Sequence, residues 1–193
     1  MMERVYLIGY MGSGKTTLGK AFAQAMHLQF IDLDWYIEER MHKTIKDLFA
    51  ERGEDGFREV ERNMLHEVGE FENVVIAAGG GTPCFFDNME YMNRTGETVF
   101  LNASFEALFR RLKVAKAKRP LLADKTDEEL AEVIRNGLAS RMGFYGKAKH
   151  WFPSDYLESR EQISGSVEQL KTLLETDKRL SLIHISEPTR HLR

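Results

Sequence analysis

Short runs of apolar residues alternate along the chain with segments in which apolar residues recur at helical spacing. The runs are apolar at nearly every position, which is typical of strands buried on both faces of a parallel sheet. They predict strands at Val5–Ile8, Gln29–Leu33, Val74–Ala77 and Thr98–Leu101, with a weaker strand near Ser154–Leu157.

After most of these strands, apolar residues recur at helical spacing. We predict helices over Thr16–Met26, Trp35–His42, Thr44–Glu51, Glu54–Phe71, Ser104–Leu112, Thr126–Met142 and Ser166–Leu174. Thr126 and Glu129 match a capping box at the start of one of them. Strands that alternate with helices predict an α/β domain, a five-stranded parallel sheet with helices on both faces.

Two segments depart from this pattern. Residues 113–124 are basic and poorly periodic, and we interpret them as a loop. From about Ser181 the sequence SLIHISEPTRHLR fits neither a helix nor a strand and resembles translated vector sequence. We therefore predict a single domain over residues 1–176 and a C-terminal tail over 177–193.

Composition narrows the class of protein. A chain of 193 residues suits one domain, and a net charge of −3 gives no general attraction for nucleic acid or anionic membranes. No apolar stretch approaches the roughly 20 residues that span a bilayer, and the start lacks a signal-peptide layout. The single cysteine, Cys84, cannot form an intrachain disulfide, and the six histidines show no metal-ligand spacing. We expect a cytoplasmic monomer that binds small molecules.

Residues Gly9–Thr16 match the phosphate-binding pattern G-x-x-x-x-G-K-[ST] between a predicted strand and a predicted helix. Glycines let the backbone aim several N–H groups at one anion, and the helix adds its positive end. Lys15 supplies a charge for the β- and γ-phosphates, and the Thr16 hydroxyl is a ligand for Mg²⁺. The alternative is a glycine-rich turn with an incidental Lys-Thr pair. The required strand–loop–helix context favours nucleotide binding.

Asp32 and Asp34 lie two positions apart at the end of the second predicted strand. Ligands of parallel sheets bind beyond the carboxyl ends of the strands, which places this pair beside the phosphate loop. The strand Val74–Ala77 ends in glycines and offers no acid for the metal, so Asp32 is the candidate to hold Mg²⁺ through water. Asp34 is a candidate to accept the proton of an attacking hydroxyl. The alternative makes Asp34 only the N-cap of the next helix.

These and later motifs, taken in order, resemble the shikimate kinase family among the nucleoside-monophosphate-kinase-like P-loop enzymes. The resemblance covers about Arg4–Leu174. It is carried by the GYMGSGKTT loop, Asp32–Asp34, Phe57–Glu61, Gly79–Gly81, Arg119–Leu122, and Arg141 with Tyr145. It implies a three-layer P-loop NTPase fold with a lid at residues 113–124 and a substrate-binding helical region at about 34–71. The implied reaction is Mg²⁺-dependent transfer of the ATP γ-phosphate to the 3-hydroxyl of shikimate.

Carried over by position, the resemblance assigns roles to individual residues. Lys15, Asp34 and Arg119 would be catalytic. ATP would be bound by Gly12, Ser13, Gly14, Lys15, Thr16, Thr17, Arg111 and Arg119, with Arg110 an equal candidate for the adenine contact. Shikimate would be held by Asp34, Arg58, Gly80 and Arg141, and Mg²⁺ by Thr16 and, through water, Asp32. Two guanidinium groups suit the carboxylate of shikimate.

Each assignment has an alternative. Arg58 and Glu61 are three apart on a predicted helix and could form an ordinary surface ion pair, or Glu61 could hold Arg58 in place. Gly79–Gly81 could be only a turn, and Arg141 could serve the helix dipole. Rival functions are a related kinase for gluconate or a nucleoside monophosphate, and a nucleotide-binding regulatory module without catalysis.

Overall fold

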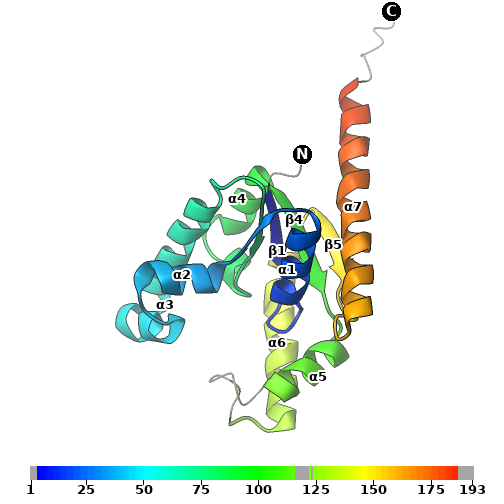
Figure 1. The fold of residues 1–193 in the computed structure, drawn as a ribbon. Coiled ribbons are helices and arrows are strands. Elements are labelled where there is room, and N and C mark those ends of the chain that lie inside the picture. The colour runs from blue at the N-terminus through cyan, green and yellow to red at the C-terminus, as the bar shows by residue number, and fades with distance from the viewer. Residues whose placement is uncertain (1–3, 116–121, 123, 187–193) are drawn as a thin grey trace, which may run out of the picture.

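The computed structural model describes residues 4–115, 122 and 124–186, with the backbone alone for 177–186. Its centre is a five-stranded parallel sheet in the order β2-β3-β1-β4-β5 (Figure 1). The strands are β1 Arg4–Ile8, β2 Gln29–Asp32, β3 Val74–Ala77, β4 Glu97–Asn102 and β5 His150–Pro153. The predicted α/β class and five-stranded parallel sheet are confirmed.

Alternate residues of each central strand belong to different cores. Tyr6 and Ile8 face one core, whereas Val5 and Leu7 face the other, and all four are fully buried. Because both faces are covered, β1 is apolar from Val5 to Ile8, as the buried part of a parallel strand must be. The sheet is therefore the middle layer of three.

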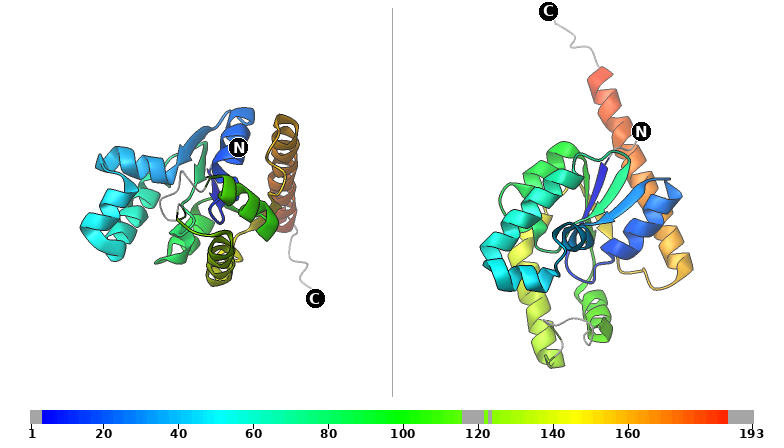
Figure 2. Two further views of the ribbon diagram at one scale, coloured as in Figure 1. Left: turned by 90° about the horizontal axis from the view of Figure 1, so that it is seen from below. Right: turned by 60° about the vertical axis from the view of Figure 1, so that its left-hand side comes forward.

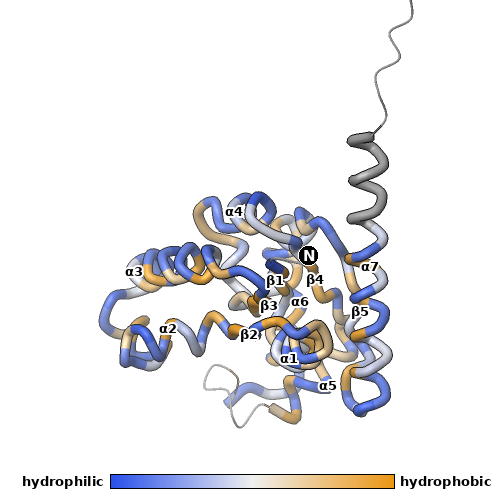
Figure 3. Tube along the Cα trace, turned by 45° about the horizontal axis from the view of Figure 1, so that its top comes forward, coloured by the Kyte–Doolittle hydropathy of each residue, from blue (hydrophilic) through white to orange (hydrophobic). Residues whose placement is uncertain are grey.

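Helices form the two outer layers (Figures 1 and 2). They are α1 Lys15–Ala25, α2 Leu33–Met41, α3 Ile45–Val68, α4 Asn88–Thr95, α5 Phe105–Ala115, α6 Asp127–Tyr145 and α7 Arg160–Ser186, with a short 3₁₀ helix, η1, at Thr82–Cys84. Side by side, α1 and α7 cover one face of the sheet, and α3, α4 and α6 pack into the core of the other. Figure 3 shows the alternating hydropathy along α3 and α7 that is typical of helices packed on one side.

Several predicted boundaries are confirmed. The long helix α3 is broken at Gly53, whose φ of 69° is the left-handed conformation that glycine adopts without strain. The capping box is present at the start of α6, with the Thr126 hydroxyl accepting from the Glu129 amide and the Glu129 carboxylate accepting from the Thr126 amide.

Other predictions were wrong. The last strand is His150–Pro153 rather than Ser154–Leu157, and α4 was missed. The backbone of α7 continues to Ser186, so the start of the predicted tail is helical. Helix α5 extends to Ala115, which makes the first three residues of the predicted loop helical. Most of the predicted lid, including Arg119, lies outside the described residues.

No helix within the described part of the chain combines the length and the apolar character needed to cross a membrane.

The close approach of α1 to the sheet gives a test of this packing. At Gly19 an added Cβ would lie 2.6 Å from Phe30 and 3.0 Å from Leu7, whereas at Gly165 in α7 it would meet nothing within 4 Å. We expect Gly19→Ala to lower the free energy of unfolding by about 1–3 kcal/mol through overpacking. Gly165→Ala, the matched control, should raise it by up to about 1 kcal/mol. Urea denaturation of both variants checks this, and stabilisation by Gly19→Ala would contradict the packing described.

Candidate active site

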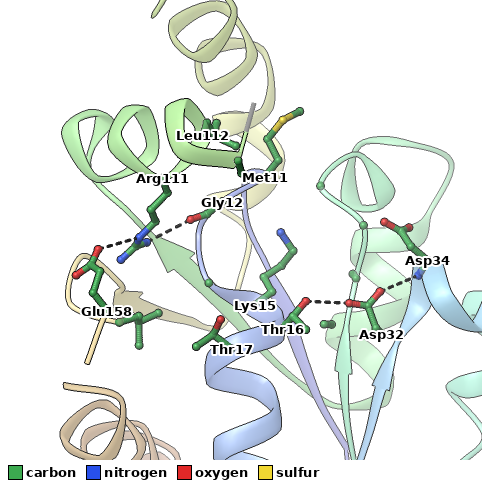
Figure 4. A pocket seen from close by; sticks show the side chains of 17 residues that line it. Met11, Gly12, Lys15, Thr16, Thr17, Asp32, Asp34, Arg111, Leu112 and Glu158 are labelled. Atoms are coloured by element: carbon green, nitrogen blue, oxygen red, sulfur yellow. Dashed lines mark hydrogen bonds and ion pairs between the residues drawn. The ribbon is translucent and has the colours of Figure 1, made fainter. Parts of the chain in front are cut away.

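A cleft of about 440 Å³ lies beyond the carboxyl ends of β1, β2 and β3 (Figure 4). The loops after β1 and β3 and the first turns of α1 and α2 form one part of its wall, as expected for an open α/β sheet, and α5 with the loop before α7 forms the rest. It is lined by Met11, Gly12, Gly14, Lys15, Thr16, Thr17, Asp32, Asp34, Ala77, Ala78, Gly79, Gly80, Arg111, Leu112, Ala115, Leu157 and Glu158. The phosphate loop and both predicted aspartates therefore share one cavity.

The phosphate loop has the backbone that the motif requires. Gly12 and Gly14 have φ angles of 81° and 97°, where a side chain would be strained. The Lys15 ammonium donates to the carbonyls of Gly9, at 2.8 Å, and Tyr10, at 3.0 Å. These bonds fold its positive charge over the loop, at the N-terminus of α1. The loop, the lysine and the helix end together make a site for an anion.

The loop that precedes α7 closes the opposite side of the cleft. A Cβ at Gly14 would lie 2.3 Å from Leu157, so only glycine allows this contact. The Arg111 guanidinium donates to the carbonyls of Gly12, at 3.2 Å, and Ser154, at 2.9 Å. Arg111 thus ties the phosphate loop to this segment (Figure 4).

The structure distinguishes Arg110 from Arg111, the two candidates for the adenine contact. Arg111 lines the cleft, and its side chain is 16% exposed. Arg110 does not line it, is 59% exposed, and pairs with Glu158 at 2.8 Å. Leu157 and Glu158 were not predicted as cleft residues, because nothing in their local sequence marks the long-range contact with Gly14.

The side chains of Thr16, Asp32 and Asp34 bring oxygen atoms to the same part of the cleft. The Thr16 hydroxyl donates to Asp32 Oδ2 at 2.9 Å, and Asp32 Oδ1 accepts from the Asp34 amide at 3.2 Å. The N-cap of α2 is therefore Asp32, and the alternative that made Asp34 the N-cap is wrong. Asp34 is in the first turn of the helix rather than at the end of a strand, and it still reaches the same cleft (Figure 4).

Asp34 is electrostatically unusual. Burial, reinforced by the negative charges of Asp32 and Glu61, raises its pKa from 3.8 to about 6, against the opposing charge of Lys15. Taking a carboxylate out of water favours its neutral form. A carboxyl group with this pKa is still mostly ionised at neutral pH and is a stronger base than an exposed aspartate.

Arg58 and Glu61 lie beside the glycine turn rather than among the residues that line the cleft. Nη1 of Arg58 donates to Glu61 Oε2 at 2.9 Å, and the two side chains are 13% and 2% exposed. The pair is buried, so the alternative of an ordinary surface ion pair is wrong. The Phe85 ring covers the guanidinium at 4.0 Å. Arg58 is thus held at its edge and on its face.

Arg58 and Arg141, the two residues predicted to bind the carboxylate of the substrate, lie beside neighbouring glycines of the Gly79–Gly81 turn. A Cβ at Gly80 would lie 3.3 Å from Nη1 of Arg141, and one at Gly81 would lie 2.9 Å from Nη2 of Arg58. Tyr145, one turn after Arg141 on α6, donates its hydroxyl to the Gly80 carbonyl at 2.6 Å. The turn is therefore fixed from α6, and both guanidinium groups lie against it.

The chain is similar in sequence and in fold to known proteins of one family. The family model described as Shikimate kinase matches residues 11–171. A shikimate kinase of Phocaeicola vulgatus is 65% identical over 173 residues, which cover 90% of this chain and 99% of the relative. The crystal structure of shikimate kinase from Bacteroides thetaiotaomicron matches with a TM-score of 0.89 at 62% identity, covering 91% of this chain and 99% of that one. The Acinetobacter baumannii shikimate kinase, solved in complex with shikimate, matches with a TM-score of 0.78 at 29% identity, covering 91% and 95% of the two chains.

The raised pKa of Asp34 predicts how pH affects stability. Between about pH 4 and pH 6 the folded protein binds more protons at this group than the unfolded chain does, so its contribution to stability falls as pH rises through that window. Asp34→Asn removes the effect. We expect that variant to exceed the parent protein in free energy of unfolding by up to about 3 kcal/mol at pH 7.5, with the difference vanishing near pH 4.

Urea denaturation at several pH values measures this difference. Asp55→Asn, the same change at an exposed position of α3, is the control with which the pH dependence of Asp34→Asn is compared. If Asp34→Asn proved less stable than the parent protein at pH 7.5, the electrostatic strain at Asp34 would be disproved.

Proposed function

The chain belongs to the shikimate kinase family, and we propose that this cleft transfers the γ-phosphate of ATP to the 3-hydroxyl of shikimate. The products are ADP and shikimate 3-phosphate, in the route to aromatic amino acids. One observation carries the assignment of the acceptor: two guanidinium groups, Arg58 and Arg141, lie against the glycine turn that borders the phosphate loop. A small acceptor with one carboxylate suits that arrangement.

ATP would be bound through the loop Gly12–Thr17. Its backbone amides and the N-terminus of α1 would receive the phosphates, and Lys15 would turn from the loop carbonyls to the β- and γ-phosphates. Arg111 and Leu157 would flank the adenine. Arg119 lies outside the described residues, and we assign it to the γ-phosphate from the sequence resemblance alone.

The ligands beside the loop fit a magnesium ion. Thr16 and Asp32 offer hard oxygen atoms, already joined at 2.9 Å, and leave the remaining coordination positions to water and phosphate, as Mg²⁺ prefers. When bound, the ion would neutralise charge on the phosphates. Asp32 would act through water, and Thr16 directly.

Shikimate would lie between the phosphate loop and the glycine turn. Arg58 and Arg141 would hold its carboxylate, and the bare backbone of Gly80 would let its ring approach closely. Asp34 would accept the hydrogen bond, and then the proton, of the 3-hydroxyl as it attacks the γ-phosphate. Its raised pKa makes it a better acceptor for that proton. Positioning and charge stabilisation would supply most of the rate.

Two rivals remain to be tested by experiment. A gluconate or nucleoside monophosphate kinase would share the phosphate loop, and a regulatory module would share ATP binding without turnover. The curated relatives at 61–65% identity are named shikimate kinase, which favours shikimate as the acceptor over both rivals. The expected monomeric state, cytoplasmic location and absence of nucleic-acid or membrane binding stay predictions.

A coupled assay for ADP tests the acceptor and the role of Asp34 together. We expect turnover with shikimate and none above background with gluconate or AMP. Asp34→Asn should reduce kcat by about 10²–10⁴, because a positioned base contributes that much, while ATP binding measured by calorimetry stays within twofold. The exposed control Asp55→Asn should retain the kcat of the parent protein. Near-normal turnover by Asp34→Asn would refute its role, and turnover of AMP or gluconate alone would refute the acceptor.

A further inference from the structure

The short helix η1, directly after the glycine turn, contacts the Arg58–Glu61 pair in a way that the assignments above leave unexplained. Thr82, its first residue, is fully buried. Its hydroxyl donates to Oε1 of Glu61 at 2.5 Å, while Oε2 of Glu61 accepts from Arg58. Each oxygen of the buried carboxylate therefore has its own donor.

The position of Thr82 is itself fixed. Asn88, also fully buried, donates its side-chain amide to the Thr82 carbonyl at 2.9 Å. This bond anchors η1 to the first residue of α4. Phe85 follows η1 directly and stacks on the Arg58 guanidinium. The same short segment thus holds Glu61 with a hydroxyl and Arg58 with an aromatic ring.

Three oxygen atoms crowd around Gly79. A Cβ there would lie 2.9 Å from the Thr82 hydroxyl, 3.0 Å from Oδ1 of Asp34 and 3.1 Å from Oε1 of Glu61. The two carboxylates therefore come close together, and the hydroxyl is the donor beside them. Because the Thr82 hydroxyl donates to Glu61, both oxygens of that carboxylate have a hydrogen-bond donor, and Glu61 stays paired with Arg58.

A buried carboxylate that loses one donor is costly unless it finds another. Without the Thr82 hydroxyl, Oε1 of Glu61 would lose its donor, and the carboxylate would rotate to share between its two oxygens the Arg58 guanidinium that already donates to Oε2. Rotation of Glu61 would turn the guanidinium with it. The face and edge that Arg58 presents to a bound carboxylate would then change, without any direct contact between Thr82 and the substrate.

We infer that Thr82 is a positioning residue for substrate binding: its hydroxyl fixes Glu61, and Glu61 in turn holds Arg58 in the orientation that receives the carboxylate of the acceptor. The inference rests on the proposed function, since it assumes that Arg58 binds that carboxylate. It makes η1 part of the specificity for the acceptor, and it leaves ATP binding unaffected.

The test compares Thr82→Val, which keeps the shape and removes the hydroxyl, with Thr82→Ser, which keeps the hydroxyl. We expect Thr82→Val to raise the KM for shikimate about tenfold, the scale of a hydrogen bond to a charged group, with the KM for ATP changed less than twofold. Thr82→Ser should restore the KM for shikimate to within about twofold, because it restores the donor.

Thr98→Val is the matched control. Thr98 lies near the start of β4, away from the cleft, and is also fully buried. Its hydroxyl donates to the side-chain oxygen of Asn93 at 2.5 Å. It should lower the melting temperature without raising the KM for shikimate. If Thr82→Val behaved in the same way, or raised both KM values alike, Thr82 would be only structural and the inference would be overturned.

Arg58→Lys separates this inference from the proposed function. An unchanged KM for shikimate in Arg58→Lys would refute the proposal that Arg58 binds the carboxylate of shikimate, whatever the result for the Thr82 variants. A raised KM in Arg58→Lys with an unchanged KM in Thr82→Val would refute the inference alone. If Thr82→Val did not fold, Thr82→Ala, which cannot overfill the site, would give the same comparison. Failure of both to fold would assign Thr82 to stability and reject the inference.

Discussion

The site depends on the need to pair charges that the fold has removed from water. Glu61 is buried and Asp34 is half-buried beside Lys15, Arg58 and Arg141, around a backbone that carries no side chains at Gly79–Gly81. A buried charge is tolerated only with partners and hydrogen bonds. Glu61 has both, whereas Asp34 has a raised pKa instead. That difference separates a carboxylate that supports structure from one poised to take a proton.

The features that could be predicted from the sequence are those encoded locally. The strands β1 and β3 are apolar at every buried position, and the phosphate loop combines its glycines, lysine and threonine in one short stretch. Asp32 and Asp34 were placed correctly beside that loop, although Asp34 reaches it from a helix. Helix α4 was missed because few of its residues are apolar, and β5 was misplaced because Trp151 and Pro153 are exposed, which leaves little of the apolar run typical of a strand.

The features that could not be predicted arise from contacts between distant segments. Nothing near Leu157 in the sequence indicates that it covers Gly14, and nothing near Thr82 indicates that it donates to Glu61. The resemblance to a family supplied Arg58 and Arg141 as a pair, and the fold brings them to adjacent glycines. Whether Arg58 and Glu61 formed a surface pair or a buried one was open from their spacing, and burial decides it.

The central claim is that two guanidinium groups recognise the carboxylate of the acceptor. Steady-state kinetics with shikimate and its uncharged methyl ester test this directly. We predict that kcat/KM for the ester is lower by about 10²-fold, the loss expected when charge-assisted hydrogen bonds to two arginines are removed, with the KM for ATP unchanged. Equal kcat/KM values for the acid and the ester would contradict it.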